Sequence, residues 1–162
     1  GLMFAKDLVA SLAAIRGVLR PGGSFGAIVW GPPERAEVHS LTNRVLMQSL
    51  GLPPVNTGKG TPFGLCDREA LERSFGAAGF TNIESQAVSV VYDFSSAEEY
   101  VQYRRERSSL EKQIAHCPEE ARERAWADVV SEARKCARPD RSLRFVNETI
   151  VITGQNAVQQ YF

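Results

Sequence analysis

The sequence lacks several features that would place it quickly in a class of protein. It has three cysteines in 162 residues, Cys66, Cys117 and Cys136, and no CxxC pair, which argues against a disulfide framework and against a zinc cluster. No apolar run approaches the roughly 20 residues that span a bilayer, and no signal-peptide pattern is found. These absences predict a cytoplasmic protein without membrane insertion or a bound metal.

The sequence also has no net charge. The 19 basic and 19 acidic residues cancel, so no overall field attracts nucleic acid or an anionic membrane, and we expect no nucleic-acid partner. The two histidines, His39 and His116, could each act as a base near neutral pH. An isolated histidine is more often a surface or hydrogen-bonded residue, and His116 beside Cys117 supplies no closed set of metal ligands.

Apolar periodicity and turn residues predict an alternation of helices and strands. Helices are expected from Asp7 to Leu19, from about Glu34 to Leu50, from Asp67 to Gly79, from Ser96 onward and from Pro118 to about Arg138; strands are expected at 24–30, 83–94 and 143–153. The nearly unbroken apolar run 24–30 is typical of a parallel strand buried on both faces. The segment 51–66 is dense in proline and glycine and predicts a long loop that could act as a lid.

These elements predict one α/β domain over residues 1–154, with a helical insertion at about 96–138 and a tail at 155–162. Cys66 next to Asp67 could be a reactive thiol at a helix N-terminus, although a plain buried cysteine is the commoner case. The acidic pairs Glu98-Glu99 and Glu119-Glu120 are explained by helix capping and the helix dipole. The run 104–107 is expected to be a solvated face.

The order of helix, turn and strand carries a family resemblance. The helix is followed by Leu19-Arg20-Pro21-Gly22-Gly23 and the strand 24–30, with Gly1-Leu2-Met3-Phe4 before it and Ala78-Gly79-Phe80 after it. This order resembles the C-terminal, substrate-side half of class I S-adenosylmethionine-dependent methyltransferases of the ubiquinone/menaquinone-biosynthesis-like, small-molecule group. The resemblance implies that the chain begins midway through such a domain.

The family fold is a Rossmann-like sheet flanked by helices. The resemblance implies that 24–30 is its fifth strand, 83–94 its sixth, and 143–153 its seventh, which is antiparallel and lies between the other two. One edge of this partial sheet is then unpaired.

The parent family uses S-adenosylmethionine as its methyl donor, but the parts that hold it are not found in this sequence. They are a glycine-rich loop after the first strand and an acidic residue at the end of the second. The cluster Gly22 to Gly26 follows a helix and precedes a strand, which is the reverse order, and 58–61 lacks the pattern of a phosphate loop. We therefore expect no cofactor to bind this chain alone, and we expect the chain alone to be inactive.

Methyl transfer in this family is an in-line displacement that depends on holding the acceptor in position, so no fixed catalytic residue is expected. The resemblance implies that Met3, Phe4, Trp30 and Phe63 line the pocket for a small-molecule methyl acceptor. Ordinary core or loop packing is the alternative for each of the four.

The sequence is compatible with two functions. The chain is a fragment of a small-molecule methyltransferase, or it is a non-catalytic interaction module that pairs through the exposed edge of strand 24–30. In either case we expect a homo-oligomer, or pairing with the missing N-terminal half of the domain.

Overall fold

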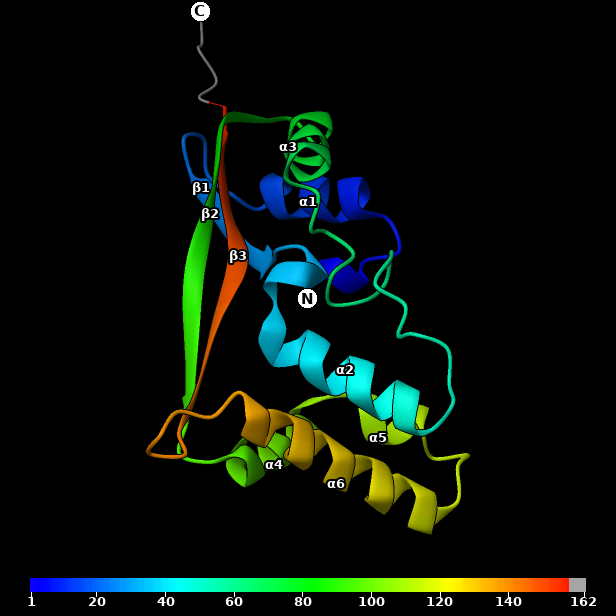
Figure 1. Ribbon diagram of the computed structural model, residues 1–162. Coiled ribbons are helices and arrows are strands. Elements are labelled where there is room, and N and C mark those ends of the chain that lie inside the picture. The colour runs from blue at the N-terminus through cyan, green and yellow to red at the C-terminus, as the bar shows by residue number, and fades with distance from the viewer. Residues whose placement is uncertain (158–162) are drawn as a thin grey trace, which may run out of the picture. The chain divides into compact units, whose positions relative to one another are not determined.

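A computed structural model describes residues 1–157, and the last five residues, 158–162, lie outside the description. The elements are η1 (Leu2–Phe4), α1 (Leu8–Gly17), β1 (Ser24–Trp30), η2 (Pro33–Arg35), α2 (Glu37–Ser49), α3 (Arg68–Ala77), β2 (Phe80–Phe94), α4 (Ala97–Arg107), α5 (Leu110–Gln113), α6 (Glu119–Lys135) and β3 (Leu143–Asn156) (Figure 1). The chain divides into two compact units. Unit 1 comprises 1–35, 57–89 and 148 onward, and unit 2 comprises 36–56 and 90–147.

The three strands form one sheet in the order β1-β3-β2. β1 pairs antiparallel with β3, with Ser24 opposite Gln155 and Trp30 opposite Thr149. The last of these strands therefore lies between the other two, in the order that the resemblance implied. β3 continues to Asn156, so the first two residues of the predicted tail belong to the sheet; Val158 to Phe162 of that tail lie outside the described residues.

The burial of β1 differs from the prediction. Ile28 is 66% exposed while its neighbour Val29 is buried, so the strand alternates rather than being covered on both faces. In unit 1, α1 and α3 lie on one face of the strands (Figure 1). Apolar composition alone misled the prediction, because an apolar run does not show whether an element covers its second face.

The core of unit 1 forms where α1 and α3 pack against the strands. Leu12 of α1, Leu71 and Phe75 of α3, and Ile152 of β3 are buried together. Gly154 permits the close approach of the aromatic side chains, because a Cβ on it would lie 3.0 Å from the Cβ of Phe80 and 3.1 Å from Cδ1 of Phe75. A larger residue at position 154 would force this cluster apart.

The turn between α1 and β1 is closed by β3. The amide of Gly22 donates to the carbonyl oxygen of Asn156, and the amide of Asn156 donates to the carbonyl oxygen of Gly23. The Arg16 guanidinium donates to the carbonyl oxygen of Ala78 at 2.9 Å, near the C-terminal end of α3. The first and last segments of the chain are thus joined by backbone hydrogen bonds within unit 1.

Unit 2 is mainly helical, and α6 packs against both α2 and α4 (Figure 1). Phe94, Tyr100 and Phe145 form a buried aromatic cluster, with the rings of Tyr100 and Phe145 4.8 Å apart. The one-turn helix α5 was not predicted. Within residues 1–157, no helix has both the length and the apolar character needed to cross a bilayer.

Two helix starts in unit 2 are capped by side chains. Ser96 accepts from the amide of Glu99, and the Glu99 carboxylate reaches back to accept from the amide of Ser95. At the start of α2, Ala36 offers no capping oxygen, and the amide of Val38 donates to Oδ1 of Asn147 on β3 at 2.9 Å. The N-terminus of α2 is thus capped by a residue far away in the sequence.

Candidate functional site

A small cavity of about 240 Å³ lies within unit 1. Its apolar lining comes from the N-terminal turn, α1, the loop before α3 and α3 itself, and two charged residues also contribute. The lining residues are Leu2, Met3, Ala5, Leu8, Lys59, Gly64, Leu65, Asp67, Ala70, Leu71 and Ser74. A concave, mainly apolar space with a few polar groups is the usual form of a small-molecule site.

Loop geometry determines where Lys59 lies. Thr61 donates from Oγ1 to the carbonyl oxygen of Gly58, and the amide of Gly64 donates to the carbonyl oxygen of Thr61. A Cβ on Gly64 would lie 3.0 Å from the Gly58 carbonyl oxygen, so glycine is required for this tight fold. The loop 58–64 thereby holds Lys59 against the cavity.

Asp67 forms the other charged part of the lining. Its Oδ1 accepts from the amide of Ala70 at 3.0 Å and so caps α3. Ser74, further along α3, donates to the carbonyl oxygen of Ala70. The cavity therefore meets α3 along its first two turns, at the positive end of the helix dipole.

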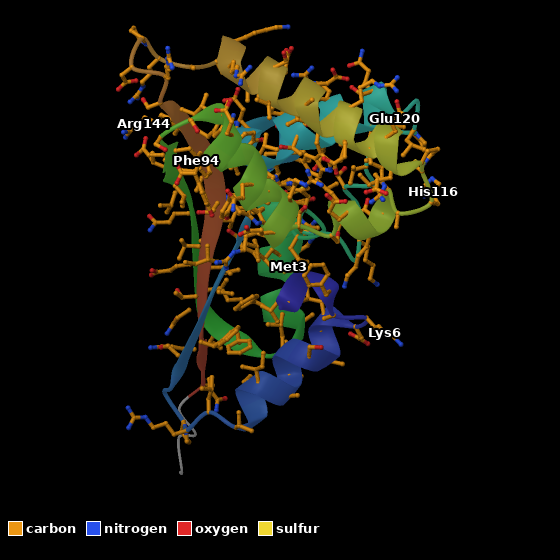
Figure 2. All side chains as sticks on the ribbon, turned by 90° about the horizontal axis from the view of Figure 1, so that it is seen from below. Met3, Lys6, Phe94, His116, Glu120 and Arg144 are labelled. Atoms are coloured by element: carbon orange, nitrogen blue, oxygen red, sulfur yellow. The ribbon has the colours of Figure 1, made fainter. Side chains whose placement is uncertain are left out.

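The four predicted pocket residues all belong to unit 1, but the structure does not gather them around this cavity. Met3, on the N-terminal turn, is in the lining (Figure 2). Phe4 is 58% exposed and Phe63 is 3% exposed, and neither is in the lining. Trp30 is half-buried at the end of β1. Sequence reasoning missed Lys59, Leu65 and Ala70, although the glycines on either side of Lys59 indicated a tight loop.

His39 and Asn43, which are half-buried, form a polar group in unit 2 with the buried Arg104. The Arg104 guanidinium lies 2.8 Å from Nδ1 of His39 and donates from its other terminal nitrogen to Oδ1 of Asn43. Because arginine can only donate, Nδ1 of His39 accepts and the ring proton is on Nε2. Burial, followed by the nearby Arg104 charge, lowers the pKa of His39 to about 3. A neutral imidazole of this kind is a hydrogen-bond acceptor for Arg104.

Arg104 contradicts the expected solvated face over 104–107. It is 2% exposed, and the next buried residues before it on α4 are Val101, Tyr100 and Ala97. Their spacing of three and four residues forms one helical stripe facing the core. Burial lowers the pKa of Arg104, and its Nε has no hydrogen-bond partner within residues 1–157. The apolar stripe was not recognised in the sequence because its last position, within the charged run, is occupied by an arginine.

The remaining candidates have structural explanations or no special environment. His116 is exposed on the turn before α6 (Figure 2). Cys66 is half-buried, and burial raises the pKa of its thiol, which disfavours the reactive thiolate. Glu98 pairs with Arg134, and the pair lies in a wider cavity of unit 2. Among residues 1–157, no three His, Cys, Asp or Glu side chains are grouped closely enough to hold a metal ion.

The His39 pKa predicts a pH-dependent stability. An unfolded histidine titrates near pH 6.5, so below that pH the unfolded chain takes up a proton that folded His39 refuses until about pH 3. The contribution of His39 to the free energy of unfolding is therefore largest above pH 6.5 and decreases as the pH falls below this value. In urea unfolding, the wild type should lose about 2 kcal/mol more than His39→Gln between pH 7 and pH 5.

His116→Gln is the matched control, because it removes the exposed histidine and should keep the wild-type pH dependence. Equal pH dependence in wild type and His39→Gln would contradict the neutral state of His39.

No family model matches the chain, and no curated protein matches it. A solved structure from Bacillus halodurans C-125, described as a "putative methyltransferase", is similar to it with a TM-score of 0.46 and 14% sequence identity. The likeness covers 98% of this chain and 62% of that one, so the chain spans less than two thirds of the neighbour's length. At this level, the likeness assigns neither a family nor an activity.

Proposed function

We propose that this chain is the substrate-side half of an S-adenosylmethionine-dependent methyltransferase acting on a small molecule. The observation that supports it best is the strand order. β3 lies between β1 and β2 and runs antiparallel to β1. That is the arrangement that the sequence resemblance requires if β1, β2 and β3 are the fifth, sixth and seventh strands of the family sheet.

The residues present do not fit the methyl donor. The connection after β1 contains Pro32 and Pro33, which have no amide hydrogen to offer a ligand, and the amide of Gly31 donates to the carbonyl oxygen of Glu148. In the first turn of α2, the amide of Val38 is also committed, because it donates to Oδ1 of Asn147. The donor therefore has to be held by another part of the enzyme, and this chain contributes to the acceptor side.

In this proposal the cavity in unit 1 holds the apolar part of the acceptor. Met3, Leu8, Leu65 and Leu71 surround the ligand and exclude water from it. Methyl transfer needs the nucleophile to be fixed in line, so shape and burial suffice for this half of the site.

Donor binding can be tested directly by titrating the purified chain with S-adenosylhomocysteine in a calorimeter. The expected result is no binding heat, because the glycine-rich loop and the acidic residue have no counterpart in the sequence. Stoichiometric binding in the micromolar range would contradict the assignment to the substrate-side half.

Acceptor binding can be tested with benzyl alcohol as a probe, followed by amide chemical shifts of the labelled protein. We expect shifts at Leu65 and Leu71, and their loss in Ala70→Leu, which fills the cavity. Ala10→Leu is the matched control, since Ala10 is an exposed residue of α1 outside the cavity. Unchanged shifts in Ala70→Leu would show that the probe binds elsewhere and would count against the acceptor pocket.

A second candidate function, an interaction module, is favoured by the edge of the sheet. β1 is an edge strand among the described residues, and its sequence Ser24 to Trp30 contains no charge and no proline. Natural edge strands usually carry a charged residue or a proline that prevents pairing, and an edge without them pairs readily with another strand. We therefore propose that two copies of the chain associate through β1.

Light scattering with size-exclusion chromatography tests this association at micromolar concentration. The wild type should be a dimer, and Ile28→Lys should be a monomer because it places a charge on the exposed side of the edge strand. Val18→Lys, at an exposed position after α1, should remain dimeric. A monomeric wild type would exclude an interaction module that pairs through β1.

A further inference from the structure

We infer that the ligand of the cavity in unit 1 is a monocyclic or similarly small molecule with a negatively charged group, such as a carboxylate, and that Lys59 binds this group. The inference rests on the proposed function, since it uses the same cavity for the acceptor. It adds the chemical class of the acceptor and the residue that selects it.

Cavity size limits the apolar part of the ligand. A cavity of about 150 Å³ in another protein is known to hold benzene. The present cavity, at about 240 Å³, has room for one ring and a few substituents. A fused polycyclic molecule or a long chain would have to leave most of its surface outside.

Polarity changes along the lining from the floor to the rim. Leu71 is buried, and Leu2, Met3, Leu8 and Leu65 are half-buried, so the inner part of the cavity is apolar. The charged lining residues, Lys59 and Asp67, are both exposed and therefore mark the rim. A ligand that matches this gradient has an apolar body inside and a polar group at the opening.

The sign of that polar group follows from what is already paired. Asp67 lies at the N-terminus of α3, where the helix dipole favours its charge, and its Oδ1 accepts from the Ala70 amide. Lys59 takes part in none of the ion pairs found within residues 1–157, so its exposed ammonium is available to an anionic group at the opening. A ligand anion completes this pairing.

Benzoate and benzyl alcohol are a suitable pair of probes, because they share a ring and differ in charge. Affinities come from amide shift titrations on wild type, Lys59→Gln, Lys6→Gln and Ala70→Leu. Lys59→Gln should weaken benzoate binding about fivefold, as for a partly exposed ion pair, and should change benzyl alcohol binding less than about twofold. Lys6 lies outside the cavity lining and points away from the ribbon, so Lys6→Gln should change neither (Figure 2).

Ala70→Leu should weaken both probes, and added salt should weaken benzoate alone. If benzyl alcohol binds in the cavity while benzoate is insensitive to Lys59→Gln, the charge selection is wrong and the proposed acceptor pocket stands. If neither probe responds to Ala70→Leu, the pocket itself is wrong and the inference fails with it. An equal loss of benzoate affinity in Lys6→Gln would also overturn the role of Lys59.

Discussion

The central position of β3 is the constraint on which the rest of the structure depends. Its C-terminal half pairs residue by residue with β1 and closes the turn at Gly22 through Asn156. Its N-terminal half supplies Phe145 to the aromatic cluster and Asn147 to the start of α2. Both units therefore take part of their core from the last strand of the chain, and neither is complete until that strand is in place.

Unit 2 has an unusual polar core. A guanidinium that is buried without a carboxylate loses solvation worth several kcal/mol, which neutral hydrogen bonds offset only in part. Arg104 obtains such bonds from His39 and Asn43, both on α2, and thereby joins α4 to α2. The arrangement also explains why His39 is unsuited to general base catalysis near neutral pH, since its acceptor nitrogen is bound to a cation.

Local signals in the sequence predicted most elements, because caps, apolar periodicity and glycine stops act over a few residues. Asp7, Asp67 and Ser96 all cap the helices expected from them. Burial depends on partners that local patterns do not show, so the open face of β1 and the buried Arg104 were missed. The candidate cavity shows the same division. Met3, which the resemblance implied as a pocket residue, lies in its lining, whereas Lys59 reaches it through a loop fold that only the three-dimensional structure shows.

The cap of α2 has a consequence for producing the protein. Asn147-Glu148-Thr149 has the form of an N-glycosylation sequon, but Asn147 is 1% exposed and its amide donates to the carbonyl oxygens of Val90 and Phe145. A glycan attached to the nascent chain in a secretory host would occupy the nitrogen that makes these bonds and would prevent the strand from packing. Substituting Thr149 to remove the sequon would also reduce stability, because the Thr149 hydroxyl donates to the carbonyl oxygen of Val88. Synthesis in a compartment without glycosylation machinery avoids both losses.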